Sequence, residues 1–403
     1  MYGLVLEGGG SKGAYQIGAC RALQEMDIEI GGVSGTSVGA INGAMLVQGD
    51  LDKVYQLWHD ISPSKVFDVN EDYLNELKNL NLNSQNLSYL MDKARTILEN
   101  RGLNIGQIKN LIEDNIDEER LRNSPMDFGM VTYSLTDMEP MELFLENIPE
   151  GKAKKFLMAS AYLPVFKFEK MDGKLFLDGG FYDNLPIRLL YSKGYRKFIA
   201  VRTFGMGRIR NLEADDIEIT YIKPSGRLGG ILDFDQNRAR KNLKMGYYDT
   251  LRVFKNYKGD KYYIEPEGEK YYIDYLMNLN RERLMRVADI LGVSRTSHRR
   301  MLFETILPRL SEYLNMDDDS NYEDIVVKMC ETLAEVYEID RFQIYKFQDL
   351  MEKIADHYEP EKKRVSKNIP DFVKHSDILS WVVKDELIEE IIFELMDNEL
   401  QKL

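Results

Sequence analysis

The chain has 403 residues, of which 44% are hydrophobic and 11% aromatic, enough to bury a sizeable core in one large domain or two ordinary ones. Its 53 basic and 67 acidic residues give a net charge of −14, opposite in sign to the charge that binds a nucleic-acid backbone, so we expect no nucleic-acid partner. The excess of acid lies in residues 311–403, which hold 24 acidic and 11 basic residues. The preceding residues are nearly neutral.

Residues 3–7 are predicted to form a short buried strand, residues 8–13 a glycine loop and residues 14–26 a helix. A second strand and helix are expected at residues 31–35 and 38–47, around a sharp turn. This β-α-β succession favours parallel strands joined by right-handed crossovers. The polar, mainly helical pattern of residues 50–103 indicates a cap or lid over a site.

Further strands are expected at residues 128–134, 141–146, 174–177, 197–202 and 217–222, followed by a helix over 237–257 and one more strand at 261–265. We therefore expect an α/β domain over residues 1–270 and an acidic, mostly helical domain over residues 271–403. The apolar stripe of the last predicted helix, residues 382–403, consists of Leu387, Ile388, Ile391, Ile392 and Leu395. Such stripes favour a stabilising shell for the second domain over the alternative, a partner-binding module.

The two cysteines, Cys20 and Cys330, are too few for a disulfide framework or a zinc cluster, which favours a reducing compartment. The sequence does not open with a basic segment followed by an apolar one, so we expect no secretory signal and a cytoplasmic protein. The uncharged residues 31–49 contain six glycines, which fits a tightly packed soluble segment better than a membrane span.

The first motif is a glycine loop of the pattern G-x-G-x-x-G between a strand and a helix: Gly8, Gly9, Gly10, Ser11, Lys12 and Gly13. A dinucleotide-binding loop would also need an acidic residue at the end of a second strand, whereas Asp27 and Glu29 precede a glycine-rich turn. Backbone N–H groups at the start of a helix can bind a phosphate or a transient oxyanion.

The second motif favours a transient oxyanion over a phosphate as the group bound by the glycine loop. Gly35, Ser37 and Gly39 form a G-x-S-x-G pattern at the predicted strand-to-helix turn, which is typical of a nucleophile elbow. A serine needs a base to take its proton. The four histidines have no recognisable active-site setting, so a Ser-His-Asp triad is not supported, although the sequence leaves His59 open: His59, His298, His357 and His375.

The third motif offers another base. Asp178 follows the predicted strand 174–177, and Gly179 and Gly180 allow an abrupt departure of the chain. The carboxylate would then lie at the carboxyl edge of the sheet, whereas an isolated Asp-Gly pair would more often indicate only a turn.

In this order the three motifs resemble the patatin-like phospholipase family. Further matches are found in two later segments: Ala159, Ser160, Ala161, Pro164, Val165 and Phe166, and then Asp183, Asn184, Leu185 and Pro186. The resemblance covers about residues 1–205 and implies an α/β fold, a three-layer α/β/α hydrolase core with a mostly parallel sheet. It also implies a Ser-Asp dyad in which Ser37 attacks an ester carbonyl and Asp178 acts as general base.

The resemblance further implies that the N–H groups of Gly9, Gly10 and Ser11 hold the oxyanion. The remaining motif residues would support these groups: Gly8, Lys12, Gly13, Gly35, Gly39, Gly179 and Gly180. Lys12 is either a solvated lysine or a residue that steadies the loop or meets an anionic head group. Asn184 and Pro186 are interpreted as a clamp on the turn after Asp178.

The expected function is that of a serine lipid acyl hydrolase of the phospholipase A type, which cleaves fatty-acyl esters in lipid metabolism. We expect no cofactor, no metal and no requirement for calcium. The partners would be a lipid or acyl-ester substrate and, transiently, a membrane surface. The alternatives are a catalytically silent lipid-binding or scaffold module of the same fold, and a soluble carboxylesterase or thioesterase with the same dyad.

Overall fold

The computed structural model describes residues 1–67, 104–167, 169–293, 296–357 and 381–400. The chain divides into two compact units, Met1–Val253 and Phe254–Leu403. This division lies before residue 270, because the strand expected at residues 261–265 pairs inside the second unit. The central residues of that expected strand form β8 (Tyr263–Ile264), which pairs parallel with β9 (Ile344–Tyr345).

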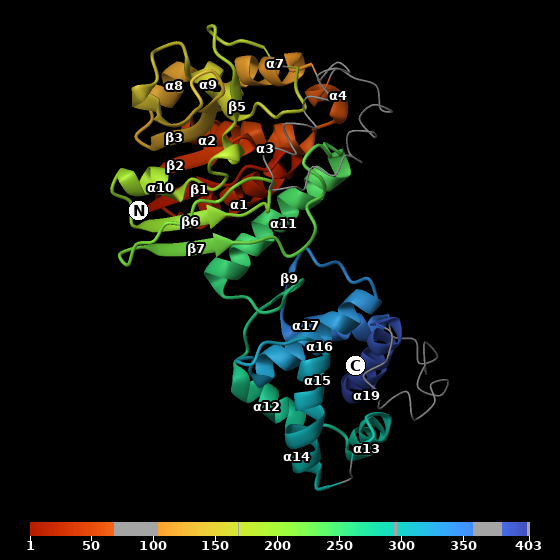
Figure 1. Cartoon of the computed structure of the whole chain (residues 1–403). Helices are drawn as coiled ribbons and strands as arrows, with labels where there is room; N and C mark the ends of the chain where they lie inside the picture. Colours follow the sequence, from red (N-terminus) through yellow and green to blue (C-terminus); the bar gives the residue numbers. More distant parts are fainter. Residues whose placement is uncertain (68–103, 168, 294–295, 358–380, 401–403) are drawn as a thin grey trace. The chain divides into compact units, whose positions relative to one another are not determined.

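A seven-stranded sheet forms the centre of the first unit, with the main strand order β4-β3-β2-β1-β6-β7 (Figure 1). Its strands are β1 (Tyr2–Leu6), β2 (Ile30–Thr36), β3 (Asp127–Ser134), β4 (Glu139–Phe144), β5 (Phe176–Asp178), β6 (Lys197–Val201) and β7 (Glu218–Ile222). The pairs β1–β2, β2–β3, β1–β6 and β6–β7 are parallel, whereas β4 and β5 pair antiparallel with β3. The expected mostly parallel sheet is confirmed.

Helices cover both faces of this sheet because successive strand residues point to opposite sides. On one face, Leu6 and Val33 pack against Gly43 of α2. On the other, Val5 packs with Leu190 of α10. The helices of the unit are α1 (Gly13–Glu25), α2 (Val38–Val47), α3 (Leu51–His59), α4 (Pro63–Val66), α7 (Gly106–Asn115), α8 (Glu118–Arg122), α9 (Ala153–Ser160), α10 (Ile187–Ser192) and α11 (Gln236–Lys255).

The parallel strands fix where the chemistry-bearing segments meet. The carboxyl ends of β1, β2 and β6 lie at the same edge of the sheet. The glycine loop follows β1, the elbow serine Ser37 follows β2, and residues 202–210 follow β6. All three segments therefore emerge side by side at that edge.

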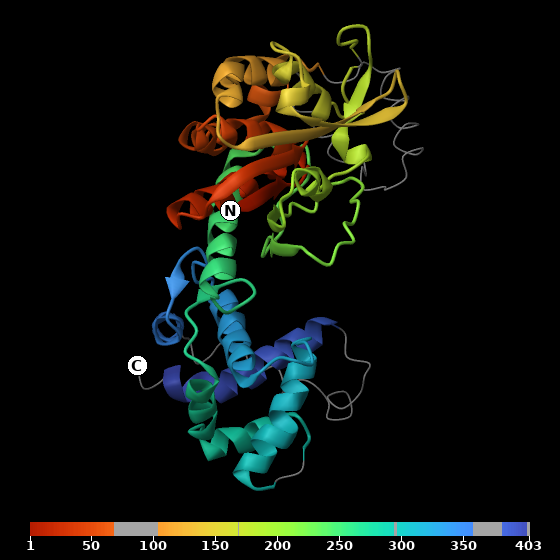
Figure 2. The same cartoon turned by 90° about the vertical axis from the view of Figure 1, so that its left-hand side faces the viewer.

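The second unit is mostly helical, as expected, and Figure 2 shows its helices from a second direction. Its elements besides β8 and β9 are α12 (Glu269–Met277), α13 (Arg281–Ile290), α14 (His298–Met301), a π-helical turn (Leu302–Ile306), α15 (Leu307–Tyr313), α16 (Tyr322–Val336), α17 (Phe347–Asp356) and α19 (Trp381–Leu400). The five apolar residues expected to form one stripe of the last helix are all buried in the core of this unit. Cys330 is buried there as a free thiol, and Cys20 is a buried free thiol of the first unit.

Part of the predicted cap over residues 50–103 lies outside the described residues, which include only α3 and α4 of that stretch. Within the described segments, every helix is too short or too polar to span a bilayer.

Candidate active site

Ser37 lies in the tight turn between β2 and α2. Its backbone has φ 57° and ψ −126°, a conformation that costs free energy in a residue with a side chain. The turn is closed by two glycines: a Cβ on Gly35 would lie 2.3 Å from the carbonyl group of Gly39. The Ser37 N–H donates to Ser160 Oγ over 2.9 Å, which fixes the start of α2. These contacts build the tight strand-to-helix turn that the G-x-S-x-G pattern predicts.

Asp178 reaches Ser37 through the register of β3. Strands β2 and β5 lie along the same edge of β3, one after the other, because β4 occupies its opposite edge. Thr36 pairs with Val131, and Asp178 pairs with the next residue of β3, Thr132. The carboxyl ends of β2 and β5 therefore meet head to head, and the side chains of Ser37 and Asp178 come together. The sequence predicted that Asp178 lies at the carboxyl edge of the sheet, but it did not predict that β5 runs antiparallel to β3.

The Asp178 carboxyl is buried, and burial raises its pKa to about 6. The Ser37 hydroxyl and the Gly180 N–H oppose that rise. Oδ1 accepts the Gly180 N–H over 2.8 Å, whereas Oδ2 has no hydrogen-bond partner among the described residues. The Ser37 hydroxyl thus lies close enough to lower the pKa without completing a hydrogen bond, a spacing common in enzymes without bound substrate.

The glycine loop presents two free donors. Gly10 has φ 57°, and a Cβ there would lie 2.2 Å from the carbonyl oxygen of Ile231. Within the described part of the chain, the N–H groups of Gly9 and Gly10 have no acceptor. The Ser11 N–H, however, donates to the Ile231 carbonyl over 2.8 Å, and its hydroxyl donates to Gly230. The oxyanion role expected for Ser11 therefore conflicts with this structure, in which Ser11 anchors the loop.

The start of the glycine loop is fixed to the segment after Asp178. The Gly8 N–H donates to the carbonyl of Asn184 over 3.0 Å, and the Asn184 side chain donates back to the Gly8 carbonyl over 3.2 Å. The Gly13 carbonyl accepts from Asn42 at the other end of the loop. Asn184 therefore clamps the glycine loop as well as the turn that the sequence suggested.

Lys12 steadies the loop as well. Its ammonium group donates to the carbonyl of Phe204 over 2.8 Å, and burial lowers its pKa. The same turn is held by the buried carboxylate of Glu7, which accepts the Phe204 N–H and pairs with Arg202 at 3.0 Å. Of the two interpretations of Lys12, the structure favours the supporting one over a freely solvated side chain.

A second buried carboxyl, Asp183, braces the same segment. Its Oδ1 accepts the N–H groups of Leu185 and Arg210 at 3.2 and 3.3 Å, and burial raises its pKa to about 7. The Thr36 hydroxyl donates to its carbonyl over 2.7 Å, which ties the segment to β2. In the sequence, Asp183 was identified only as one of the residues that match the family, and its bracing role was not predicted.

None of the described histidines joins Ser37. His59 pairs with Asp60 at the surface, His298 contacts the carbonyl of Leu279, and His357 lies in the second unit. The fourth, His375, lies outside the described residues. Among those described, no three His, Cys, Asp or Glu side chains are arranged to hold a metal ion.

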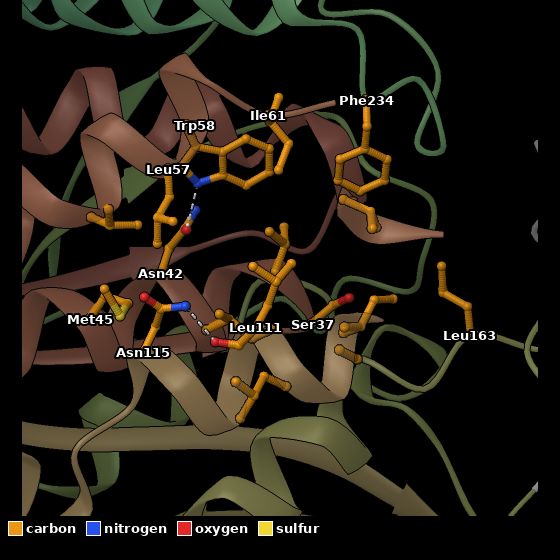
Figure 3. A pocket seen from close by; sticks show the side chains of 18 of the residues that line it. Ser37, Asn42, Met45, Leu57, Trp58, Ile61, Leu111, Asn115, Leu163 and Phe234 are labelled. Carbon is orange, nitrogen blue, oxygen red and sulfur yellow. Dashed lines mark hydrogen bonds between the residues drawn. The ribbon is translucent and has the colours of Figure 1, made fainter. Parts of the chain in front are cut away.

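An apolar cavity of about 130 Å³ opens beside Ser37 (Figure 3). It is lined by four separate parts of the first unit: Gly10, Ser37, Val38, Ile41, Asn42, Met45, Val54, Leu57, Trp58, Ile61, Val66 and Phe67, then Ile108, Leu111, Ile112, Asn115 and Ile116, then Ala161, Leu163 and Phe166, and finally Ile231, Leu232 and Phe234. Trp58 and Phe234 stack with ring centroids 6.2 Å apart. Sequence reasoning missed this cavity, because no local pattern shows that these segments converge.

The two amides in the lining are already engaged. Asn42 accepts from Trp58 Nε1 over 2.9 Å and donates to Gln16, and Asn115 donates to the carbonyl of Leu111. The cavity therefore offers an incoming group almost exclusively apolar surface. Ser37 contributes a hydroxyl at one side of it, with Met45 at the other in Figure 3.

The fold and site define an α/β unit of the hydrolase type, with a buried serine in a strained strand-to-helix turn beside an apolar cavity. The model of the family described as patatin-like phospholipase matches residues 4–191. Curated relatives include patatin-like phospholipase domain-containing protein 7 of Rattus norvegicus, which is 25% identical over 49% of this chain and 13% of its own length. Lysophospholipase NTE1 of Kluyveromyces lactis is 23% identical over 67% of this chain and 17% of its own length. The N-terminal unit belongs to the patatin-like phospholipase family.

The chain spans less than a fifth of the length of these relatives. A third, neuropathy target esterase sws of Drosophila melanogaster, is 26% identical over 49% of this chain and 12% of its own length. Among solved structures, VipD from Legionella pneumophila aligns over 97% of this chain and 91% of its own, with 15% identity and a TM-score of 0.40.

Proposed function

We propose that the N-terminal unit is a serine acyl hydrolase that cleaves fatty-acyl esters through Ser37 and Asp178. The observation that carries the proposal is the placement of a strained, buried serine between a buried carboxyl of raised pKa and an apolar cavity. The relatives named phospholipase, lysophospholipase and esterase support the same class of reaction.

In the proposed mechanism, Asp178 takes the proton of the Ser37 hydroxyl as Oγ attacks the ester carbonyl carbon. The carbonyl oxygen becomes an oxyanion near the N–H groups of Gly9 and Gly10. Collapse breaks the bond to the alcohol, which leaves with the proton from Asp178. Water then repeats the sequence on the acyl-enzyme, with Asp178 again the base, and releases the fatty acid.

The cavity explains why the substrate should carry a long acyl chain. Val38, Ile41 and Met45 line it from one face of α2, at helical spacing from the elbow. Met45 lies eight residues beyond Ser37, so this wall extends about 12 Å along the helix axis. An acyl chain bound there would lie beside α2 with its carbonyl carbon next to Ser37.

The test is fatty-acid release from phospholipid vesicles, acylglycerols and short-chain esters, with wild type and Ser37→Ala at equal folded concentration. We expect Ser37→Ala to abolish release and reaction with a serine-directed fluorophosphonate. The matched control is Ser192→Ala, because Ser192 only donates to the Leu189 carbonyl in α10 on the other face of the sheet. Release by Ser37→Ala at the wild-type rate would refute the proposal.

The substrate panel also separates the alternatives. A preference for phospholipid indicates a phospholipase, and activity confined to short esters indicates a soluble carboxylesterase. Binding of fatty acid in the cavity, without hydrolysis of any ester, would indicate a silent lipid-binding module.

A further inference from the structure

Residues 202–210 (RTFGMGRIR) form a loop that is fixed to both halves of the proposed site. The carbonyl of Phe204 accepts from Lys12 of the glycine loop over 2.8 Å. Further along, the N–H of Arg208 donates to the carbonyl of Gly180, two residues after the proposed base, over 2.8 Å. The loop therefore has a defined position at the edge of the sheet where Ser37 lies.

Phe204 turns its ring outward from this loop. Its side chain is 53% exposed although phenylalanine is among the residues most often buried. Its backbone has φ 46°, in the left-handed region that glycine and asparagine adopt far more readily than an aromatic residue. Within the loop, the Arg202 guanidinium lies over the ring, 4.9 Å from its centroid, and more than half of the side chain still remains exposed. Burial therefore does not account for a phenylalanine at this strained position, which points to a contact outside the chain.

The loop itself is positively charged. It holds three arginines and no acidic residue, within the nearly neutral part of the chain that precedes residue 311. Arg202 pairs with Glu7 at 3.0 Å, and Arg210 lies 3.7 Å from Glu142. Arg208 is exposed and forms no ion pair with a described residue.

Next to Arg208, Ile209 is 37% exposed. One fixed loop thus presents an aromatic ring, an aliphatic side chain and a guanidinium group that has no ion pair among the described residues. Apolar groups that enter the acyl boundary and cations that meet anionic head groups are the combination that binds peripheral proteins to membranes. The surface of a partner protein would not by itself require this charge.

We propose that residues 202–210 dock the N-terminal unit on an anionic lipid surface, with Phe204 and Ile209 inserted among the lipids and Arg208 at the head groups. The role of this docking rests on the proposed function: because the loop lies beside the proposed catalytic residues, docking would bring lipid esters to Ser37. The docking itself is measurable without hydrolysis.

The first test is sedimentation of the full chain with vesicles of phosphatidylcholine and phosphatidylglycerol in equal parts. Phe204→Asn removes the ring and suits the positive φ, so the fold is retained while binding weakens about tenfold from the lost apolar transfer. Arg208→Gln weakens binding about fivefold on these vesicles and has little effect on pure phosphatidylcholine. The control is Val253→Asn, which removes a 39% exposed apolar side chain near the end of α11 and leaves binding unchanged.

A second variant reports insertion directly. In F204W the added indole should shift its emission to shorter wavelength when anionic vesicles are added, beyond any change of the wild type. Ser37→Ala should bind as the wild type does. Binding that depends on Phe204 in a protein without hydrolysis supports docking and contradicts the proposed function. No binding by the wild type, equal binding by Phe204→Asn, or an equal loss in Val253→Asn overturns the docking proposal.

Discussion

Replacing Asp178 by asparagine should abolish hydrolysis and change the stability in a direction that depends on pH. The pKa of this carboxyl is raised by burial from 3.8 to about 6, so the folded protein holds the proton more tightly than the unfolded chain. Ionised Asp178 therefore costs folding free energy at pH 7, about 3 kcal/mol for a rise of this size. The cost is absent below about pH 4, where both states are protonated, and complete above about pH 6.

The asparagine side chain avoids this cost but adds a smaller one. Its oxygen can keep the 2.8 Å hydrogen bond from Gly180, whereas its NH₂ group replaces Oδ2, which is buried without a partner. An unsatisfied buried donor costs about 1–3 kcal/mol. We therefore expect Asp178→Asn to be about 1 kcal/mol more stable than the wild type at pH 7 and to lose this advantage as the pH falls to 4, where the wild-type carboxyl is protonated as well.

The assay is urea unfolding of both proteins from pH 4 to pH 8. The difference in their free energies of unfolding isolates the titration of Asp178, because the other groups titrate alike in both. Asp172→Asn is the control, since Lys155 and Lys152 lower the pKa of that exposed carboxyl to about 2. That carboxyl is ionised in the folded and the unfolded protein over almost all of this pH range, so its difference from the wild type should stay nearly constant. A difference between wild type and Asp178→Asn that stays constant with pH would show that the buried carboxyl does not titrate as argued.

Wild-type hydrolysis should itself rise about tenfold between pH 5 and pH 7, since the proposed base must be ionised, and a flat pH–rate profile contradicts that role. Gly10→Ala should lower kcat about 10²–10³-fold, because its Cβ would displace an oxyanion donor; Gly194→Ala, also at positive φ but with open space around it, should not. Met45→Phe should shorten the preferred acyl chain by filling the far part of the cavity, and an unchanged chain-length profile in the ester panel would argue against that path. Glu331→Ala should destabilise the second unit by about 3 kcal/mol in thermal unfolding, because the carboxylate accepts three backbone N–H groups of residues 260–262.

The elements around the motifs could be predicted because their signals are local. The strand expected at residues 31–35 and the helix expected at 38–47 correspond to β2 and α2 within one residue. The strand expected at 261–265 is present as β8, but its partner β9 lies about 80 residues further along the chain. Its place in the second unit follows from that long-range pairing, which the residues of the strand itself do not encode.

The same distinction separates the site residues. Ser37 could be found because the glycines that its turn requires are its near neighbours in sequence. The contact between Ser37 and Asp178 depends on consecutive pairings along β3, and the role of Ser11 depends on a carbonyl 220 residues away at Ile231. Geometry set by such distant partners is available only after the chain has folded.

Helix α2 shows why the chemistry could be named from sequence while the cavity could not. An almost wholly apolar helix is expected to be buried on all sides, and small residues such as Gly39 and Gly43 do press one side of α2 against the sheet. Its other side, with Ile41 and Met45, faces the cavity instead of a neighbouring element. An empty space lined by apolar groups and a packed core require the same residue types. The sequence of α2 therefore predicts burial equally well in both cases, and only the arrangement of α3, α7 and residues 231–234 around it determines that Ser37 stands beside room for an acyl chain.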